Sequence, residues 1–407
     1  MKIACIGNMN NNMFALVRHL RSRNFDCELI LLDEMEHFLP QYDTFNNDYK
    51  KFTFQFKWEI INFYTHSKND ILNQIKKYDF LIGCHTSPAF IEKSGRKLDI
   101  FIPYGGDLYD TPFIYNKSSL KNYKIKEIYN FFVWNSRKII FKNKQKKGIQ
   151  SAFKIISNTN WKHAQDAINR LNCKAVNIPR IMVFKEKIPK NILEKYSWIN
   201  NYDFVVFSPT RHAWKSNNER LSDFKENGGS KRNDKLIKAF DRIIKKNKFK
   251  NPLLIFCEYG LDTEHSKKLI KELKINNNVK WLPLLPRKEI IAIISKITFV
   301  ADQFRIGMCG TSAGITNEAL AYGKPVITNT DKAIFNKDDP YYGSEILEAL
   351  SEKDIFEYFL DYSKNSDKYK EIGRRSSEWF NQNIINKPLN FIINEINEKQ
   401  KYLENNI

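Results

Sequence analysis

The chain has 407 residues, of which 66 are Lys or Arg and 46 are Asp or Glu, giving a formal net charge of +20. This length suggests two domains of ordinary size. Hydrophobic residues make up 42% and aromatic residues 14% of the chain, which excludes a disordered or fibrous protein.

The cysteines predict a protein of a reducing compartment, and the apolar runs predict that no helix spans a membrane. The six cysteines are scattered, with no CxxC pair and no metal-ligand spacing, so neither a disulfide framework nor a zinc site is expected. No run approaches the roughly 18 apolar residues that cross a bilayer, and the first residues lack the pattern of a secretory signal. We therefore expect a cytoplasmic protein.

The positive charge has two interpretations. It indicates an anionic partner, such as a nucleic acid, a membrane surface or a phosphorylated substrate. Alternatively, it reflects a composition crowded with Lys, Asn and Ile, as AT-rich genomes produce. The sequence leaves both open.

Apolar, strand-like runs alternate with helical periodicity from the first residue onward, which predicts α/β domains with parallel sheets covered on both faces. The expected strands of a first series are residues 2–7, 27–32, 78–82, 100–103, 153–157 and 175–178. Those of a second series are residues 204–208, 253–257, 279–282, 297–301 and 325–328. A charged, proline-containing stretch near residue 187 separates them, so we expect Rossmann-like domains at 1–186 and 187–385 and a helical tail at 386–407.

The turn after the first strand carries a single glycine, Gly7, followed by a run of asparagines. A dinucleotide site needs a G-x-G-x-x-G turn, so the sequence argues against a dehydrogenase. Gly7 is expected to form a tight strand-to-helix turn facing an interdomain cleft.

The second series carries the pattern of an anion site. Arg211 directly follows a strand and Lys231 directly precedes a helix, so both can bind one phosphate at the carboxyl edge of the sheet. A glycine-rich loop then leads into another helix, which contains Glu318. The backbone amides of that loop can approach an anion, and the loop residues concerned are Gly310, Thr311, Ser312 and Gly314.

In the first series, a strand delivers Gly105, Gly106 and Asp107 to the edge of the sheet, and His85 follows another strand. Asp107 is the first candidate for contacting a substrate or acting as a base, and His85 is the second. Both also have structural interpretations, as an Asx-turn residue and as an ordinary structural histidine.

These segments resemble bacterial glycosyltransferases of the GT-B fold, most closely the family-4-like group that makes surface polysaccharides. The matching segments are residues 207–211, 231–240, 279–284 with 287–290, and Asn-Glu-Ala-Leu-Ala-Tyr-Gly-Lys-Pro-Val-Ile at 317–327. The resemblance implies two Rossmann-like domains across a cleft, with a nucleotide sugar carrying UDP or GDP as donor and a glycan or lipid-linked acceptor. It implies no bound metal or other cofactor.

The resemblance assigns Arg211 and Lys231 to the donor diphosphate and Glu318 to the donor ribose. Replacing a carboxylate with that role is expected to weaken donor binding and leave the melting temperature nearly unchanged. The family's Glu-x7-Glu motif is broken, because Gly310 stands where the first glutamate belongs. Asp302 and Gln303 are candidates to contact the donor sugar in its place.

Residues 117–154 are rich in Lys, Arg and aromatic residues, with Glu127 as the only acid. This stretch predicts either a peripheral contact with an anionic membrane or an amphipathic helix with solvated lysines. The function expected overall is a glycosyltransferase of surface polysaccharide or glycoconjugate synthesis. A catalytically degenerate GT-B-like partner subunit is the alternative, and a nucleic-acid-binding protein ranks lower because no nucleic-acid-binding motif accompanies the charge.

Overall fold

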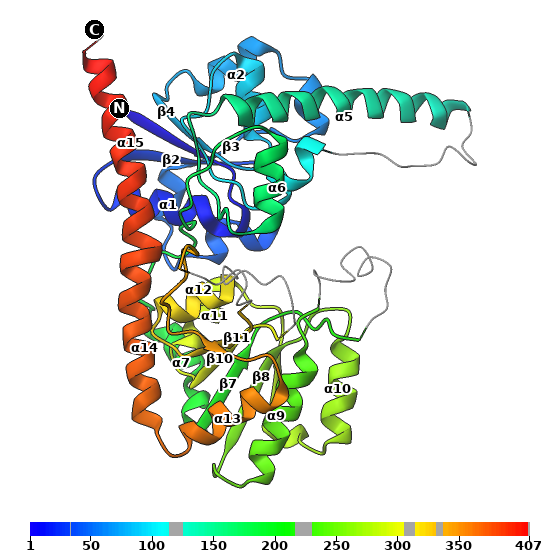
Figure 1. Ribbon diagram of the computed structural model, residues 1–407, viewed down its shortest axis with the longest axis vertical. Helices are drawn as coiled ribbons and strands as arrows, with labels where there is room; N and C mark the ends of the chain where they lie inside the picture. Colours follow the sequence, from blue (N-terminus) through cyan, green and yellow to red (C-terminus); the bar gives the residue numbers. More distant parts are fainter. Residues whose placement is uncertain (33, 114–124, 216–229, 305–313, 331–336, 406–407) are drawn as a thin grey trace. The chain divides into compact units, whose positions relative to one another are not determined.

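The computed structural model describes residues 1–32, 34–113, 125–215, 230–304, 314–330 and 337–405, with side chains from residue 136 in the long helix α5. The described residues form two compact units (Figure 1). The first unit comprises Met1–Gln41, Asn46–Phe184 and Asn386–Ile407, and the second comprises Tyr42–Phe45 and Lys185–Ile385.

Each unit contains a six-stranded parallel sheet. In the first unit the strand order is β3-β2-β1-β4-β5-β6, and in the second it is β12-β11-β10-β7-β8-β9. The first sheet consists of β1 (Lys2–Ile6), β2 (Asp26–Leu31), β3 (Thr53–Gln55), β4 (Phe80–Gly83), β5 (Ile100–Phe101) and β6 (Lys154–Ile155). The second consists of β7 (Phe204–Ser208), β8 (Pro252–Cys257), β9 (Val279–Leu282), β10 (Phe299–Ala301), β11 (Val326–Thr328) and β12 (Leu347–Glu348).

Helices connect the strands, as parallel pairing requires. In the first unit they are α1 (Asn12–Arg21), α2 (Lys68–Ile75), α3 (Ser87–Ser94), α4 (Gly106–Tyr109), α5 (Ile125–Ser151), α6 (Lys162–Arg170) and α15 (Lys387–Glu404). In the second they are α7 (Lys190–Lys195), α9 (Asn233–Lys245), α10 (Thr263–Glu272), α11 (Arg287–Ile294), α12 (Gly314–Ala321), α13 (Glu352–Tyr362) and α14 (Ser366–Phe380). The predicted α/β class with two Rossmann-like domains is confirmed.

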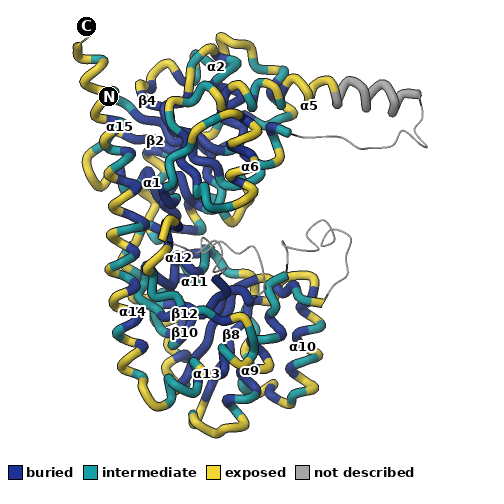
Figure 2. The backbone as a smooth tube through the Cα atoms, in the orientation of Figure 1, coloured by how far each residue is buried: buried dark blue, intermediate teal, exposed yellow. Residues whose placement is uncertain are grey.

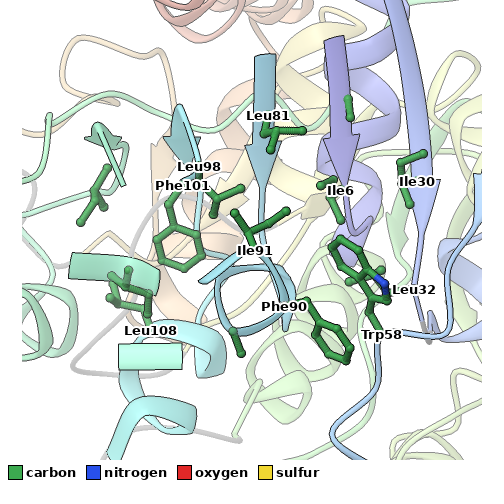
Figure 3. Packing of buried hydrophobic residues seen from close by; sticks show 14 of the residues in the cluster. Ile6, Ile30, Leu32, Trp58, Leu81, Phe90, Ile91, Leu98, Phe101 and Leu108 are labelled. Atoms are coloured by element: carbon green, nitrogen blue, oxygen red, sulfur yellow. The ribbon is translucent and has the colours of Figure 1, made fainter. Parts of the chain in front are cut away.

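The core of the first unit lies between its sheet and the helices packed on it. Figure 3 shows Ile6, Leu81 and Phe101 from three strands packed near Trp58 and Phe90. The indole of Trp58 stacks on Phe90 with 5.0 Å between ring centroids, and both residues are fully buried. Aromatic side chains of this size bury the most apolar area, so this cluster fixes α3 against the sheet.

Helices α3 and α5 approach very closely. A Cβ added to Gly148 of α5 would lie 2.0 Å from the carbonyl oxygen of Pro88 in α3, so only glycine fits at this crossing. Phe141 lies seven residues before Gly148 on α5. It is fully buried, and its ring packs edge to face on the ring of Phe63. One face of α5 therefore belongs to the core.

Helix α15 also packs on the first unit, against α1. Its Leu389, Ile392 and Ile396 are buried, and Figure 2 shows buried positions recurring along the helix. Glu395 pairs with Lys154 at 3.1 Å, and Lys399 pairs with Asp99 at 3.2 Å. Residues from the far end of the sequence thus complete this unit.

The second unit has an aromatic core around Phe204 of β7. The ring of Phe204 packs near those of Phe240 and Phe359 from helices α9 and α13, Phe299 from the neighbouring strand β10, and Phe249 from the connection between α9 and β8. None of the helices in the described part of the chain is both long and apolar enough to traverse a bilayer.

Candidate active site

The strand order of the second sheet has a switch point, where the direction of the connections reverses. The chain runs outward from β7 through β8 to β9 and then returns to the other side of β7 with β10. Open parallel sheets bind ligands outside the carboxyl ends of the strands at such a switch point. Here the residues that follow β7 and β10 flank it.

Arg211 follows β7, and its side chain is exposed at this edge. The next residue, His212, is fully buried, with its Nδ1 2.8 Å from Ser266 Oγ and its ring against Trp281. Burial lowers the pKa of His212 to about 4, so the imidazole is neutral near pH 7. His212 therefore anchors the loop by packing, and Arg211 carries the positive charge.

Lys231 lies beside the same loop. Its backbone N–H donates to the carbonyl of Ala213 at 2.6 Å, and its Nζ donates to Oε1 of Gln303. The following Arg232 adopts a left-handed conformation (φ 53°) at the start of α9 and forms a bidentate pair with Asp234 at 2.9 Å. The structure thus places Lys231, the loop of Arg211 and the end of β10 together.

Asp302 and Gln303 follow β10 and are both buried. Oδ2 of Asp302 accepts a hydrogen bond from Thr316 Oγ1 of α12 at 2.7 Å. The backbone carbonyl of Asp302 accepts from Thr210 Oγ1 at 3.3 Å, which ties it to the Arg211 loop. Through these two hydrogen bonds, Asp302 holds α12 next to the switch point.

Glu318 on α12 is buried, with 7% of its surface exposed, and pairs with Arg287 at the start of α11. Arg287 Nε donates to Glu318 Oε1 at 2.6 Å, and its Nη1 lies 3.4 Å from Oδ1 of Asp43. Burial raises the pKa of the Glu318 carboxyl, with the charges of Asp43 and Asp302 acting in the same direction and Arg287 opposing them. Oε2 of Glu318 accepts no hydrogen bond from the residues that the structure describes.

Sequence reasoning did not identify Arg287 as the partner of Glu318, nor Asp43 as a third charge in the group. Asp43 lies in a four-residue segment, Tyr42–Phe45, that belongs to the second unit although its neighbours in sequence belong to the first. No sequence pattern marks this segment. Of the predicted loop residues, Gly314 begins α12, whereas Gly310, Thr311 and Ser312 lie outside the described residues.

In the first unit, the predicted residues also meet at the carboxyl edge of the sheet. Gly7 follows β1 with φ +86°, and a Cβ there would lie 2.6 Å from Sγ of Cys84, which follows β4. His85, the next residue, adopts a left-handed conformation with φ 59° and stacks on Tyr104 at 5.8 Å. Strained backbone of this kind is common at functional sites.

Asp107 holds this turn together. Its Oδ2 accepts from the backbone N–H of His85 at 2.9 Å, and its Oδ1 accepts from those of Gly105 at 3.0 Å and Tyr104 at 3.1 Å. Burial raises the pKa of the Asp107 carboxyl to about 6, although these hydrogen bonds act to lower it. Gly106 is the first residue of α4. The structure thus brings Gly7, His85 and Asp107 into one cluster.

Within the described ranges, no group of three or more His, Cys, Asp or Glu side chains is arranged to hold a metal ion. The absence of a bound cofactor stays a prediction.

Residues 225–337 match the family model described as glycosyl transferases group 1. No curated protein matches the sequence. The match confirms the expectation of a glycosyltransferase-type enzyme. The finer assignment to the family-4-like group stays a prediction.

Solved structures with the same fold cover nearly the whole chain. The structure of Anabaena Alr3699/HepE in complex with UDP has 14% sequence identity and a TM-score of 0.57, covering 98% of this chain and 100% of that one. WaaG, a glycosyltransferase involved in lipopolysaccharide biosynthesis, has 11% identity and a TM-score of 0.53, covering 94% and 96%. UDP-GlcNAc 2-epimerase from Neisseria meningitidis, bound to UDP-GlcNAc, has 10% identity and a TM-score of 0.55, covering 98% and 100%. These neighbours confirm the GT-B fold, which serves more than one reaction.

Proposed function

We propose that this protein transfers a sugar from a UDP- or GDP-sugar to a glycan or lipid-linked acceptor in bacterial surface polysaccharide or glycoconjugate synthesis. The observation that carries the proposal is a set of hydrogen bonds at one switch point of the second sheet. Lys231 bonds to Gln303, and the neighbouring Asp302 bonds to Thr210 beside Arg211 and to Thr316 on α12, the helix that carries Glu318. The UDP in the Anabaena neighbour and the UDP-GlcNAc in the Neisseria neighbour support a nucleotide-sugar donor. The match to the group 1 transferase model favours transfer over epimerisation.

The donor's diphosphate is assigned to Arg211 and Lys231. As the glycosidic bond to the donor breaks, negative charge develops on the diphosphate, and two fixed cations stabilise it more than they stabilise the uncleaved donor. The N-terminus of α12, at Gly314, adds a partial positive charge at the same edge. On this proposal the protein needs no metal ion or other cofactor.

The donor's ribose is assigned to Glu318. Arg287 fixes one carboxylate oxygen, and Oε2 is available to accept hydrogen bonds from the ribose hydroxyls. A charged acceptor bonds hydroxyls more strongly than a neutral one.

The acceptor hydroxyl is assigned to the turn of His85 and Asp107. With inversion of the sugar, Asp107 or His85 removes the hydroxyl proton, and a carboxyl with a pKa of about 6 is ionised and basic enough for this near pH 7. With retention, the donor phosphate assists the acceptor and Asp107 only orients it.

A cytoplasmic location at the inner face of the membrane is proposed from α5. Figure 1 shows this helix reaching beyond the other helices of its unit. On its described part, Ile139 and Ile140 are 56% and 51% exposed. The basic residues around them are Arg137, Lys138, Lys142, Lys144, Lys146 and Lys147. Exposed isoleucines among cations fit an anionic bilayer surface, where apolar side chains enter the interface and cations meet headgroups.

The test is donor turnover. The purified protein is incubated with UDP- and GDP-sugars, and the release of UDP or GDP is measured with and without acceptor glycans. Arg211→Ala should lower kcat/KM by about 10²-fold or more, because a charge-assisted contact with the leaving diphosphate is lost. Lys248→Ala, three residues beyond the C-terminal end of α9, removes an exposed cation on the opposite side of the sheet from the switch point and should change nothing.

Wild-type kinetics in Arg211→Ala would remove this residue from the donor site. If the wild-type protein releases no nucleotide from any donor, the alternative of a degenerate partner subunit replaces the proposal. Salt-dependent binding of mixed-sequence DNA or RNA, measured on the same preparation, would instead favour the nucleic-acid function.

A further inference from the structure

The side-chain amide of Asn329 is buried without a hydrogen-bonding partner. Asn329 directly follows β11 at the carboxyl edge of the second sheet, and only 1% of its surface is exposed. Among the residues that the structure describes, neither Nδ2 nor Oδ1 makes a hydrogen bond. Both a donor and an acceptor are therefore unused on one side chain.

Such a group is costly for a folded protein. Buried polar atoms almost always find a partner, because losing water without a replacement costs about 1–3 kcal/mol for each group. Leucine has a similar size and would carry no such cost. An asparagine at this position therefore points to a ligand that both accepts and donates hydrogen bonds.

Asn329 lies next to Gln303, at the end of the adjacent strand β10. The backbone N–H of Asn329 donates to the carbonyl of Gln303 at 2.8 Å, and Thr328 Oγ1 donates to the same carbonyl at 3.2 Å. Oε1 of Gln303 accepts from Lys231 Nζ, which fixes the orientation of the Gln303 amide. Its Nε2 donates to no described residue, so a further donor is available beside Asn329.

We propose that the amides of Gln303 and Asn329 form the subsite for the donor's sugar, taking a neutral, hydroxyl-bearing hexosyl group. This inference rests on the proposed function. A hydroxyl donates one hydrogen bond and accepts others, so it satisfies both orphaned atoms of Asn329 at once. Two neutral amides would thus replace the carboxylate that is missing at position 310.

The position of the subsite agrees with the chemistry of a nucleotide sugar. The sugar is bonded directly to the terminal phosphate of the donor, so its subsite must adjoin the phosphate site. Lys231, assigned to the diphosphate, is hydrogen-bonded to Gln303. One residue therefore links the two subsites.

The experiment compares a nucleotide with its sugar. Wild-type protein, Asn329→Ala and Asn329→Leu are titrated by calorimetry with UDP, GDP, UDP-glucose, UDP-galactose, UDP-N-acetylglucosamine and GDP-mannose. The control is Asn277→Ala, an exposed asparagine just before β9, on the opposite edge of the same sheet.

We expect both Asn329 variants to bind the preferred nucleotide sugar about 5-fold or more weakly, because one or two neutral hydrogen bonds are lost. Their affinity for the free nucleotide should stay within about 2-fold of wild type. Without ligand, Asn329→Leu should melt at or above the wild-type temperature, because the buried, unpaired amide is gone. The control should match wild type throughout.

Three results would overturn the assignment. Variants that keep the wild-type ratio of sugar-nucleotide to nucleotide affinity would show that Asn329 does not contact the sugar, although the proposed function would stand. A melting temperature of Asn329→Leu more than about 5 °C below wild type would show that the amide has a structural partner. A wild-type protein that binds neither nucleotides nor nucleotide sugars would overturn the proposed function and the subsite together.

Discussion

The buried pair of Glu318 and Arg287 makes a prediction that can be worked out from its geometry. The change is Glu318→Gln, which keeps the size of the side chain and removes its charge. Arg287 then stays buried, with 9% exposed, and loses a partner at 2.6 Å. Removing one partner of a buried ion pair costs about 3–5 kcal/mol, because the other charge is left uncompensated.

Asp43 reduces this cost. Its Oδ1 lies 3.4 Å from Nη1 of Arg287, so part of the compensating negative charge remains. We therefore expect the free energy of unfolding to fall by about 2–3 kcal/mol, which for a unit of this size lowers Tm by roughly 5–10 °C. Donor affinity should fall as well, because the bonds from Oε2 to ribose lose their charge-assisted strength.

The measurements are scanning calorimetry and nucleotide titration on the same samples. Glu272→Gln is the matched control, because its carboxylate is exposed and lies 4.0 Å from Lys268, a surface pair worth about 0–1 kcal/mol. A Tm within about 1 °C of wild type for Glu318→Gln would refute the reasoning and show that the pair contributes nothing to folding.

Two further predictions concern the first unit. Burial raises the pKa of Asp107 to about 6 in the folded state. The free energy of unfolding should therefore fall by about 3 kcal/mol as pH rises from about 4 to above 6. Urea melts of Asp107→Asn should lack this part of the pH dependence. An unchanged pH dependence in that variant would assign it to other groups. On α5, replacing four lysines with glutamine should weaken binding to anionic vesicles by about 1 kcal/mol for each residue at the surface, less for Lys144, which lies 3.6 Å from Glu92. The four lysines are Lys142, Lys144, Lys146 and Lys147, and the control set is Lys246, Lys248 and Lys250. Equal binding of both sets of variants to anionic and neutral vesicles would contradict the membrane contact.

The strands that the sequence predicts well are those at the centres of the sheets. The structure has β7 at Phe204–Ser208, with the predicted bounds, and β8 at Pro252–Cys257, one residue longer than predicted, because a buried parallel strand reads as a continuous apolar run. The short edge strands β3 and β12 have no such run, and Phe54 in β3 is 40% exposed. The expected strand at 175–178 is only a single bridge between Ile156 and Val176, since apolar residues there pack without a full ladder.

The candidate site was predictable where residues follow strands in sequence. Arg211, Asp302 and Asp107 could be placed because parallel strands all end at one edge of their sheet. The partner of Glu318 could not be placed, because Arg287 reaches it from another helix and no spacing links them. The melting behaviour expected for Glu318→Gln from sequence assumed a carboxylate without a buried partner, and the pair with Arg287 reverses that expectation. Asn329 could not be predicted from the sequence, because only the structure shows that its buried side-chain amide makes no hydrogen bond with the described residues.

The packing of α15 on the first unit has a consequence for how the protein is made. A ribosome releases the chain from its first residue onward, and domains generally fold as they emerge. Every residue of the second unit, including Tyr42–Phe45, has been synthesised once the chain reaches residue 385. The first unit still lacks Leu389, Ile392 and Ile396 at that point. Until those side chains arrive, the surface of α1 that they cover is exposed to the cell. The unit that is synthesised first is therefore the one that finishes folding last, and its exposed face is where we expect a nascent chain of this protein to depend on chaperones.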